Sequence, residues 1–100
     1  MLVDQIRDDL KSALKAKEEP RLTVLRGVLS AMTQELTATN RTPQDTLSDE
    51  EALAVIRREL KRRQDAAQQF VSGNRPELAE AEVAEAQVLQ TYLPQMMSRE

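Results

Sequence analysis

The sequence contains neither cysteine nor histidine. Without cysteine, the chain has no disulfide, no thiolate nucleophile and no cysteine metal site. Without histidine, it lacks the usual general base near neutral pH and the commonest zinc ligand. We therefore expect no catalytic residue, no metal ligand and no cofactor-binding residue in this chain.

Aromatic residues and glycines are also scarce. Phe70 and Tyr92 are the only aromatic residues, and glycine occurs twice. Leucine, alanine and charged residues dominate instead. Because strands favour β-branched and aromatic residues, this composition favours a bundle of helices. One hundred residues suit a single small domain.

Long apolar runs are absent as well. No run approaches the roughly 18 residues that a membrane-spanning helix needs. The first turns carry Asp4, Asp8 and Asp9, where a secretory signal peptide would have a basic start and an apolar stretch. From these features we expect a cytoplasmic protein with no membrane partner.

Apolar residues recur at helical spacing in four segments, which predicts an all-α fold with four helices. The predicted helices cover about residues 2–17, 20–37, 49–72 and 75–92. The third begins at a capping box, in which Ser48 and Glu51 satisfy each other's backbone amides. Short connections make the first and second helices, and the third and fourth, antiparallel neighbours.

The turn between the third and fourth helices is predicted from its small and polar residues. Gly73 suits the position just after the end of a helix, where a left-handed conformation is common. Asn74 is then predicted as the N-cap of the fourth helix, with Glu77 at the third position of its first turn.

The last residues suggest a second domain. Residues 1–94 form the predicted helical domain, which Pro94 ends. Met96 and Met97 would be an exposed apolar pair unless something covers them. We therefore expect residues 95–100 to be the start of a linker to a second helical domain that is absent from this chain.

Glu85 lies on the predicted apolar stripe of the fourth helix, which starts at Leu78. A buried, unpaired carboxylate would cost several kcal/mol, so the sequence predicts a basic partner. Arg26 on the second helix is the first choice, with Lys61 and Arg57 as alternatives. We expect Glu85 and Arg26 to form a structural pair that fixes the register of the helices; a role in ligand binding is the alternative.

The most unusual stretch is basic. Residues 57–63 carry a net charge of +4 in a chain whose net charge is −3. With the core direction of the third helix set by its leucine and isoleucine residues, Arg58, Lys61 and Arg62 point outward, while Arg57 and Arg63 lie on the shoulders.

Two interpretations of these cations remain open. Pairing of Glu59 with Arg63 and of Lys61 with Asp65 is expected at i,i+4 spacing and leaves about three cations without a local acid. They form either a solvated or interhelical charged face, or a contact surface for a polyanion. Because aromatic residues are so few, a nucleic acid would be held by its phosphates and not by its bases.

Several motifs follow one another along the chain: Ile6-Arg7-Asp8-Asp9-Leu10-Lys11, Leu25-Arg26, Arg58-Glu59-Leu60-Lys61-Arg62-Arg63-Gln64-Asp65 with Phe70, Gly73-Asn74-Arg75-Pro76-Glu77-Leu78, and Leu89-Gln90-Thr91-Tyr92-Leu93-Pro94. In this order and spacing they resemble the GatB/YqeY family over essentially the whole chain. The resemblance implies a four-helix N-terminal domain, normally followed by a smaller helical domain.

The same resemblance implies a function. Related regions form the helical and tail portion of the B subunit of the tRNA-dependent amidotransferase, whose tail engages tRNA. Family membership thus implies the label of a carbon–nitrogen ligase with glutamine as amido-N-donor, without supplying a catalytic residue here. We expect a non-catalytic YqeY-like module associated with tRNA or with the amidotransferase, in which Arg58, Lys61 and Arg62 contact phosphates. The alternative is a protein–protein interaction or adaptor module with no nucleic-acid role.

Overall fold

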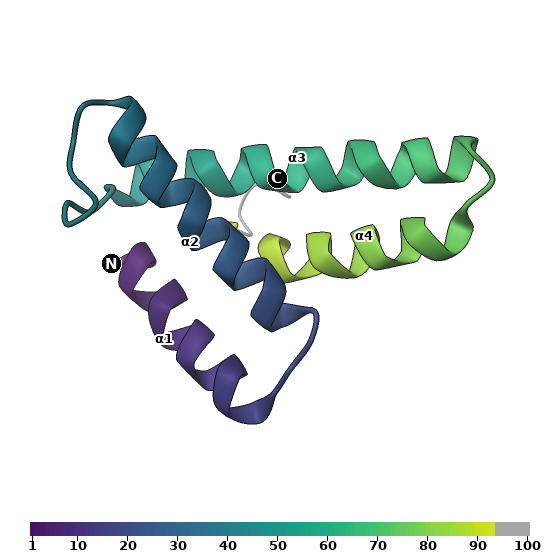
Figure 1. Ribbon diagram of the computed structural model, residues 1–100, viewed down its shortest axis with the longest axis horizontal. Helices are drawn as coiled ribbons and strands as arrows, with labels where there is room; N and C mark the ends of the chain where they lie inside the picture. The colour runs from purple at the N-terminus through teal and green to yellow at the C-terminus, as the bar shows by residue number, and fades with distance from the viewer. Residues whose placement is uncertain (94–100) are drawn as a thin grey trace, which may run out of the picture.

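Two helical hairpins cross each other in the computed structural model, which describes residues 1–93 (Figure 1). The elements are α1 (Leu2–Ala16), α2 (Arg21–Ala38), α3 (Asp49–Ser72) and α4 (Pro76–Gln90). The prediction of an all-α fold with four helices is confirmed, and the described residues contain no strand. The predicted linker at 95–100 lies outside them.

The core is centred on α2, which packs on α1 along one side and on α3 and α4 along the other (Figure 1). Val24, Leu25 and Val28 of α2 are fully buried. Each of the other three helices adds a fully buried side chain to this core: Ile6 from α1, Ile56 from α3 and Leu89 from α4. The buried side of α2 is therefore the centre of the core.

The far end of the α3–α4 hairpin extends beyond the first hairpin (Figure 1). There α3 and α4 pack only on each other, so each helix keeps one exposed flank. Val71, which its spacing predicts to be core, is 64% exposed. Leu78 on α4, where the predicted apolar stripe of that helix starts, is exposed as well. The apolar pattern is correct in period there, but no third helix covers these positions.

The turn between α3 and α4 differs from its prediction by one residue. Asn74, and not Gly73, has the left-handed conformation, with φ 64°. The amide of Asn74 donates to the carbonyl of Val71 and the amide of Arg75 donates to that of Phe70, at 3.1 and 2.7 Å, so that the turn is a Schellman motif. Glycine and asparagine both tolerate this conformation, so the dipeptide alone leaves the choice open.

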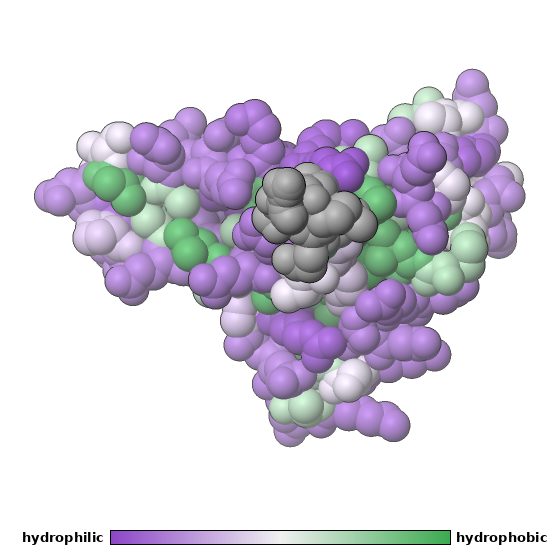
Figure 2. All heavy atoms as spheres, turned by 180° about the vertical axis from the view of Figure 1, so that it is seen from behind, coloured by the Kyte–Doolittle hydropathy of each residue, from purple (hydrophilic) through white to green (hydrophobic). Residues whose placement is uncertain are grey.

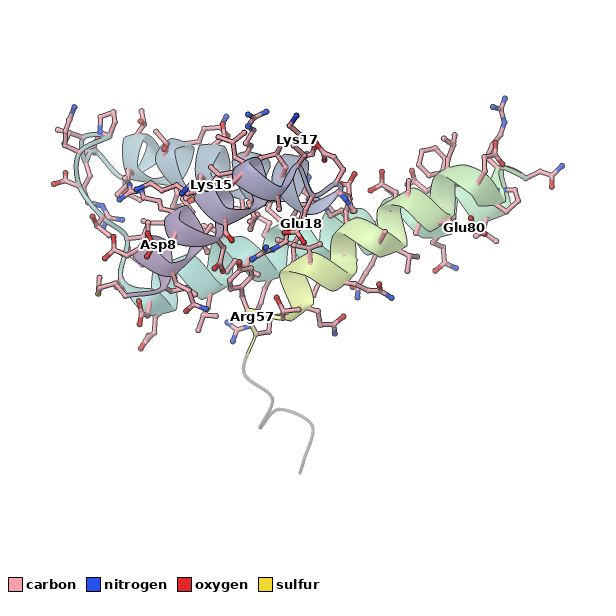
Figure 3. The ribbon with its side chains drawn as sticks, turned by 90° about the horizontal axis from the view of Figure 1, so that it is seen from below. Asp8, Lys15, Lys17, Glu18, Arg57 and Glu80 are labelled. Carbon is pink, nitrogen blue, oxygen red and sulfur yellow. The ribbon has the colours of Figure 1, made fainter. Side chains whose placement is uncertain are left out.

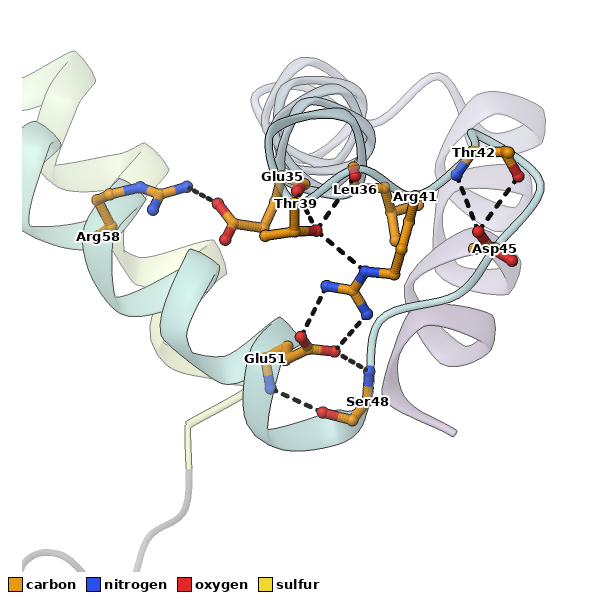
Figure 4. A network of polar contacts seen from close by, with 9 residues as sticks. All are labelled: Glu35, Leu36, Thr39, Arg41, Thr42, Asp45, Ser48, Glu51 and Arg58. Atoms are coloured by element: carbon orange, nitrogen blue, oxygen red, sulfur yellow. Dashed lines mark hydrogen bonds and ion pairs between the residues drawn. The ribbon is translucent and has the colours of Figure 1, made fainter.

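The start of α3 is the predicted capping box (Figure 4). The Ser48 hydroxyl accepts from the amide of Glu51, and the Glu51 carboxylate accepts from the amide of Ser48. Arg41, just after α2, donates two further hydrogen bonds to the same carboxylate, at 3.1 and 2.7 Å. These hydrogen bonds, first that of Arg41 and then that of the Ser48 amide, lower the pKa of Glu51 to about 2.

We expect replacement of Glu51 by glutamine to have a pH-dependent effect. The pKa of an unfolded glutamate is about 4.3, so the ionised Glu51 stabilises the fold above that pH and stops doing so as the pH falls toward about 2. The melting temperature of Glu51→Gln should therefore lie below that of the wild type near neutral pH, and the two should converge in acid. Glu50→Gln, on the same turn, is the matched control. A difference that stays constant down to about pH 2 would contradict the assignment.

A second polar cluster ties the end of α4 to the first hairpin. The hydroxyl of Tyr92 donates to the carboxylate of Asp9 on α1, and Arg21 at the start of α2 lies 3.7 Å from the other oxygen of that carboxylate. Burial of the Tyr92 ring, and then this hydrogen bond, raise the pKa of the tyrosine. Asp9 thus has a structural role that its position in an acidic N-terminal stretch did not predict.

Candidate functional site

The outward face of α3 carries the three predicted contact residues. The side chains of Arg58, Lys61 and Arg62 are between 54% and 75% exposed. The prediction that they point outward is confirmed. They occupy a little more than one turn of a 24-residue helix whose opposite side packs into the core through Ile56 and Leu60.

Each of these cations has an acidic neighbour. Lys61 lies 3.3 Å from Asp65, as predicted, while Arg62 lies 3.2 Å from Glu59. Arg58 lies 3.5 Å from Glu35 on α2 (Figure 4). The prediction that about three cations lack a local acid differs by one: among the described residues, Arg57 and Arg58 have no acidic partner on α3, while Arg62 shares Glu59 with Arg63. In the pairs of Arg58 with Glu35 and of Lys61 with Asp65, each side chain is at least 32% exposed. Such exposed pairs contribute little, about 0–1 kcal/mol, so an incoming phosphate can displace them.

Arg63 has a different role from its outward neighbours. Its side chain is only 16% exposed and lies between two carboxylates. One nitrogen donates to the Glu59 side chain at 3.1 Å, and another donates to Glu85 on α4 at 3.2 Å. Glu59 is the buried acid of this group, with 9% of its side chain exposed. Arg63 therefore joins α3 to α4 and is not available to a ligand.

The predicted partner of Glu85 is thus wrong: Glu85 pairs with Arg63, and the side chain of Arg26 is exposed on α2. Glu85 itself is one-quarter exposed, so it is less buried than its predicted stripe implies. One signal in the sequence points to the observed pair. Arg63 and Glu85 are each eleven positions from Asn74, the centre of the turn, and an antiparallel hairpin brings such positions together.

Gly27 on α2 lies against this pair. Its Cβ position is 3.8 Å from a guanidinium nitrogen of Arg63, an ordinary van der Waals distance. A larger side chain at this position would reach the guanidinium and displace it. The neighbour of Gly27 is thus a side chain of α3, at an ordinary contact distance that leaves room for a Cβ.

A polar cleft of about 280 Å³ lies on the same side of the hairpin. Its lining includes three glutamates, Glu59, Glu82 and Glu85, and two arginines, Arg62 and Arg63. No side chain of this cleft is a nucleophile placed beside a base. In the part of the chain from residue 1 to 93, no group of three acidic side chains is arranged to hold a metal ion. The cleft is lined by the ion-pair network that joins Arg62 and Arg63 to Glu59 and Glu85.

The other exposed cations lie elsewhere on the molecule. Lys15 lies in the last turn of α1 and Lys17 just after its end, and Figure 3 shows them on the opposite side of the view from Arg57. Their neighbourhood includes Asp8 and Glu18, which the same view labels. The exposed cations are thus distributed over several elements, and only α3 presents three of them within five residues. Within residues 1–93, no helix is both long and apolar enough to cross a membrane.

Comparison with known proteins gives a consistent result. The family model described as "Yqey-like protein" matches residues 3–100. "Altered inheritance of mitochondria protein 41, mitochondrial" of Lachancea thermotolerans is 33% identical over 96 residues, which are 94% of this chain and 49% of that protein. The protein of the same name from Vanderwaltozyma polyspora is 32% identical over 90 residues, 88% of this chain and 46% of that protein.

An uncharacterized protein of Schizosaccharomyces pombe is 29% identical over 93 residues, 93% of this chain and 72% of that protein. The chain thus spans about half the length of the two relatives from Lachancea and Vanderwaltozyma. The names of those two relatives place them in mitochondria, which contradicts the expectation of a cytoplasmic protein. That expectation depended on the lack of a secretory signal and of an apolar span, and neither feature bears on mitochondrial import.

Proposed function

The chain belongs to the YqeY-like family, and from that premise we propose that it is a non-catalytic helical module that binds the phosphate backbone of tRNA through the outward face of α3. The observation that supports this function most directly is the group formed by Arg58, Lys61 and Arg62. Their side chains are more than half exposed and project from one rigid helix. Association with a tRNA-dependent amidotransferase is part of the same proposal.

The chemistry of these side chains suits phosphate. Arginine presents a fork of N–H donors that matches two phosphate oxygens, and lysine adds a point charge. The acids that hold them in the unbound protein are Glu35, Asp65 and Glu59. In the pairs of Arg58 with Glu35 and of Lys61 with Asp65, each side chain is at least 32% exposed, so phosphate competes with them at small cost. Because no aromatic side chain flanks the three cations, binding does not depend on base sequence.

The test is the affinity for bulk tRNA as a function of salt concentration, measured by mobility shift. Wild-type protein should bind at low salt, and the Arg58→Ala, Lys61→Ala, Arg62→Ala triple variant should bind much more weakly. Losing three phosphate contacts should reduce the slope of log K against log salt by about 2–3. The matched control removes three exposed cations elsewhere: Lys11→Ala, Lys15→Ala and Arg26→Ala.

The control has the same net charge as the triple variant, so a difference between them identifies α3 as the contact surface. Equal loss in both variants would show that tRNA responds only to net charge. Absence of binding by the wild type at low salt would contradict the proposal. It would favour the second candidate, a protein–protein interaction module in which the ion pairs of α3 are purely structural.

A further inference from the structure

The projecting end of the α3–α4 hairpin has two unlike sides. One side carries the charged cleft with Arg62 and Glu85. The other side carries an apolar groove of about 370 Å³, seen in Figure 2 as hydrophobic atoms along the hairpin, left in that view. Val71 and Val83 flank this groove and are 64% and 47% exposed.

The floor of the groove is made of small residues. Ala67 on α3 and Ala79 on α4 lie between the two valines in the lining. Because alanine side chains are short, another helix can approach the backbone of both α3 and α4 closely there. The groove runs between two antiparallel helices, so its shape suits a helix lying along it and not a compact small molecule.

The polar rim of the groove indicates which helix it accepts. Three of its polar side chains are the amides Gln64, Gln68 and Gln87, and its one charged side chain is Glu80. A partner recognised by strong opposite charge would find almost no charge to pair with. An amide, in contrast, is both donor and acceptor, so one amide can pair with another. The surface is therefore complementary to itself.

Self-complementarity is the property that a two-fold interface requires, since it places the same patch of both subunits face to face. We propose that the groove is the contact surface of a homodimer, in which the α3–α4 hairpins of two copies pack on each other and bury Val71 and Val83. The outward face of α3 is not part of this interface, because none of Arg58, Lys61 and Arg62 lines the groove and Arg62 lines the charged cleft instead.

The first experiment measures molar mass by sedimentation equilibrium over a range of protein concentrations. Wild-type protein should pass from monomer to dimer, with little dependence on salt because the groove carries almost no charge. The Val71→Asp, Val83→Asp variant should dimerise about a hundredfold more weakly, because two buried carboxylates would face two others. Both positions are exposed in the monomer, so circular dichroism should show an unchanged helical fold.

Leu14→Asp is the matched control, since it places a carboxylate on an exposed leucine of α1, away from the groove. It should leave the dissociation constant unchanged. Wild-type protein that remains monomeric at the highest concentration would overturn the proposal and leave the groove to another partner. A dimer that both aspartate variants weaken equally would also overturn it, because the contact would then not be specific to the groove.

The absence of cysteine from the sequence permits a second experiment. Single cysteines are introduced one at a time at Gln68, Val71 and Val83, with Ser12→Cys on α1 as the reference position. Under mild oxidation, at least one groove variant should form a covalent dimer several times faster than Ser12→Cys. Equal rates at all four positions would overturn the proposal.

Discussion

Replacing Arg63 by methionine is expected to lower the free energy of unfolding by about 3 kcal/mol, the low end of the range for breaking a buried ion pair. Arg63 holds the side chain of Glu59, the backbone carbonyl of Glu59 and the side chain of Glu85. Methionine keeps much of the volume but leaves the buried Glu59 with only Arg62, whose own side chain is mostly exposed. Urea unfolding at neutral pH measures the change.

Two further variants show whether the loss comes from the unpaired charge. The double variant Arg63→Met, Glu59→Leu removes both members of the buried Arg63–Glu59 pair. It should recover much of the lost stability, because replacing a buried pair by apolar side chains is often neutral. Lys61→Met, which removes an exposed cation paired with Asp65, should change stability by less than about 1 kcal/mol. An effect of Arg63→Met no larger than that of Lys61→Met would contradict the structural role of Arg63.

This result bears on the binding proposal as well. Of the five basic residues between 57 and 63, Arg63 is committed to the α3–α4 contact, so substituting it would confuse loss of fold with loss of binding. Arg62 shares Glu59 with Arg63, and its removal leaves the buried pair intact. The alanine variant at Arg58, Lys61 and Arg62 therefore tests phosphate contact without removing the tie between the helices.

The helices themselves were predictable from local signals. The capping box at Ser48 fixes the start of α3, and the periodic apolar residues of α1 and α2 fix both their extent and, through Ile6 and Leu25, their buried face. These signals suffice where a helix is amphipathic and covered along its whole length. The motifs also suffice for the family, whose model matches residues 3–100.

The orientation of α4 was less predictable. Its apolar residues are distributed around the whole helix, so the sequence allows several choices of buried face. Ala79, Ala86 and Leu89 are the buried ones, whereas the predicted stripe begins at Leu78 and runs through Glu85. The side of the hairpin that packs on α2 decides between these choices, and that is a property of the whole fold. The partner of Glu85 likewise depends on how the helices pack in the whole fold.

Replacing Leu47 by alanine is expected to lower the free energy of unfolding by about 2–4 kcal/mol, as truncation of a buried leucine commonly does. Leu47 lies in the connection between α2 and α3, which its polar residues predict to be a surface loop. Its side chain is nevertheless 1% exposed, and it faces Leu29, Leu36 and Val3 across a cavity of about 90 Å³. Truncation would enlarge this cavity at a point where α1 and α2 both meet the loop.

Leu14→Ala is the control, because Leu14 is half-exposed on α1, and a change within about 0.5 kcal/mol is expected there. Thermal unfolding should show a single transition for both variants if the loop belongs to the cooperative core. Asp49 at the start of α3 also accepts a hydrogen bond from the amide of Leu2, at 2.8 Å. The connection therefore places the start of α3 beside the start of α1. A loss at Leu47 as small as that at Leu14 would contradict a structural role for Leu47 in joining the two hairpins.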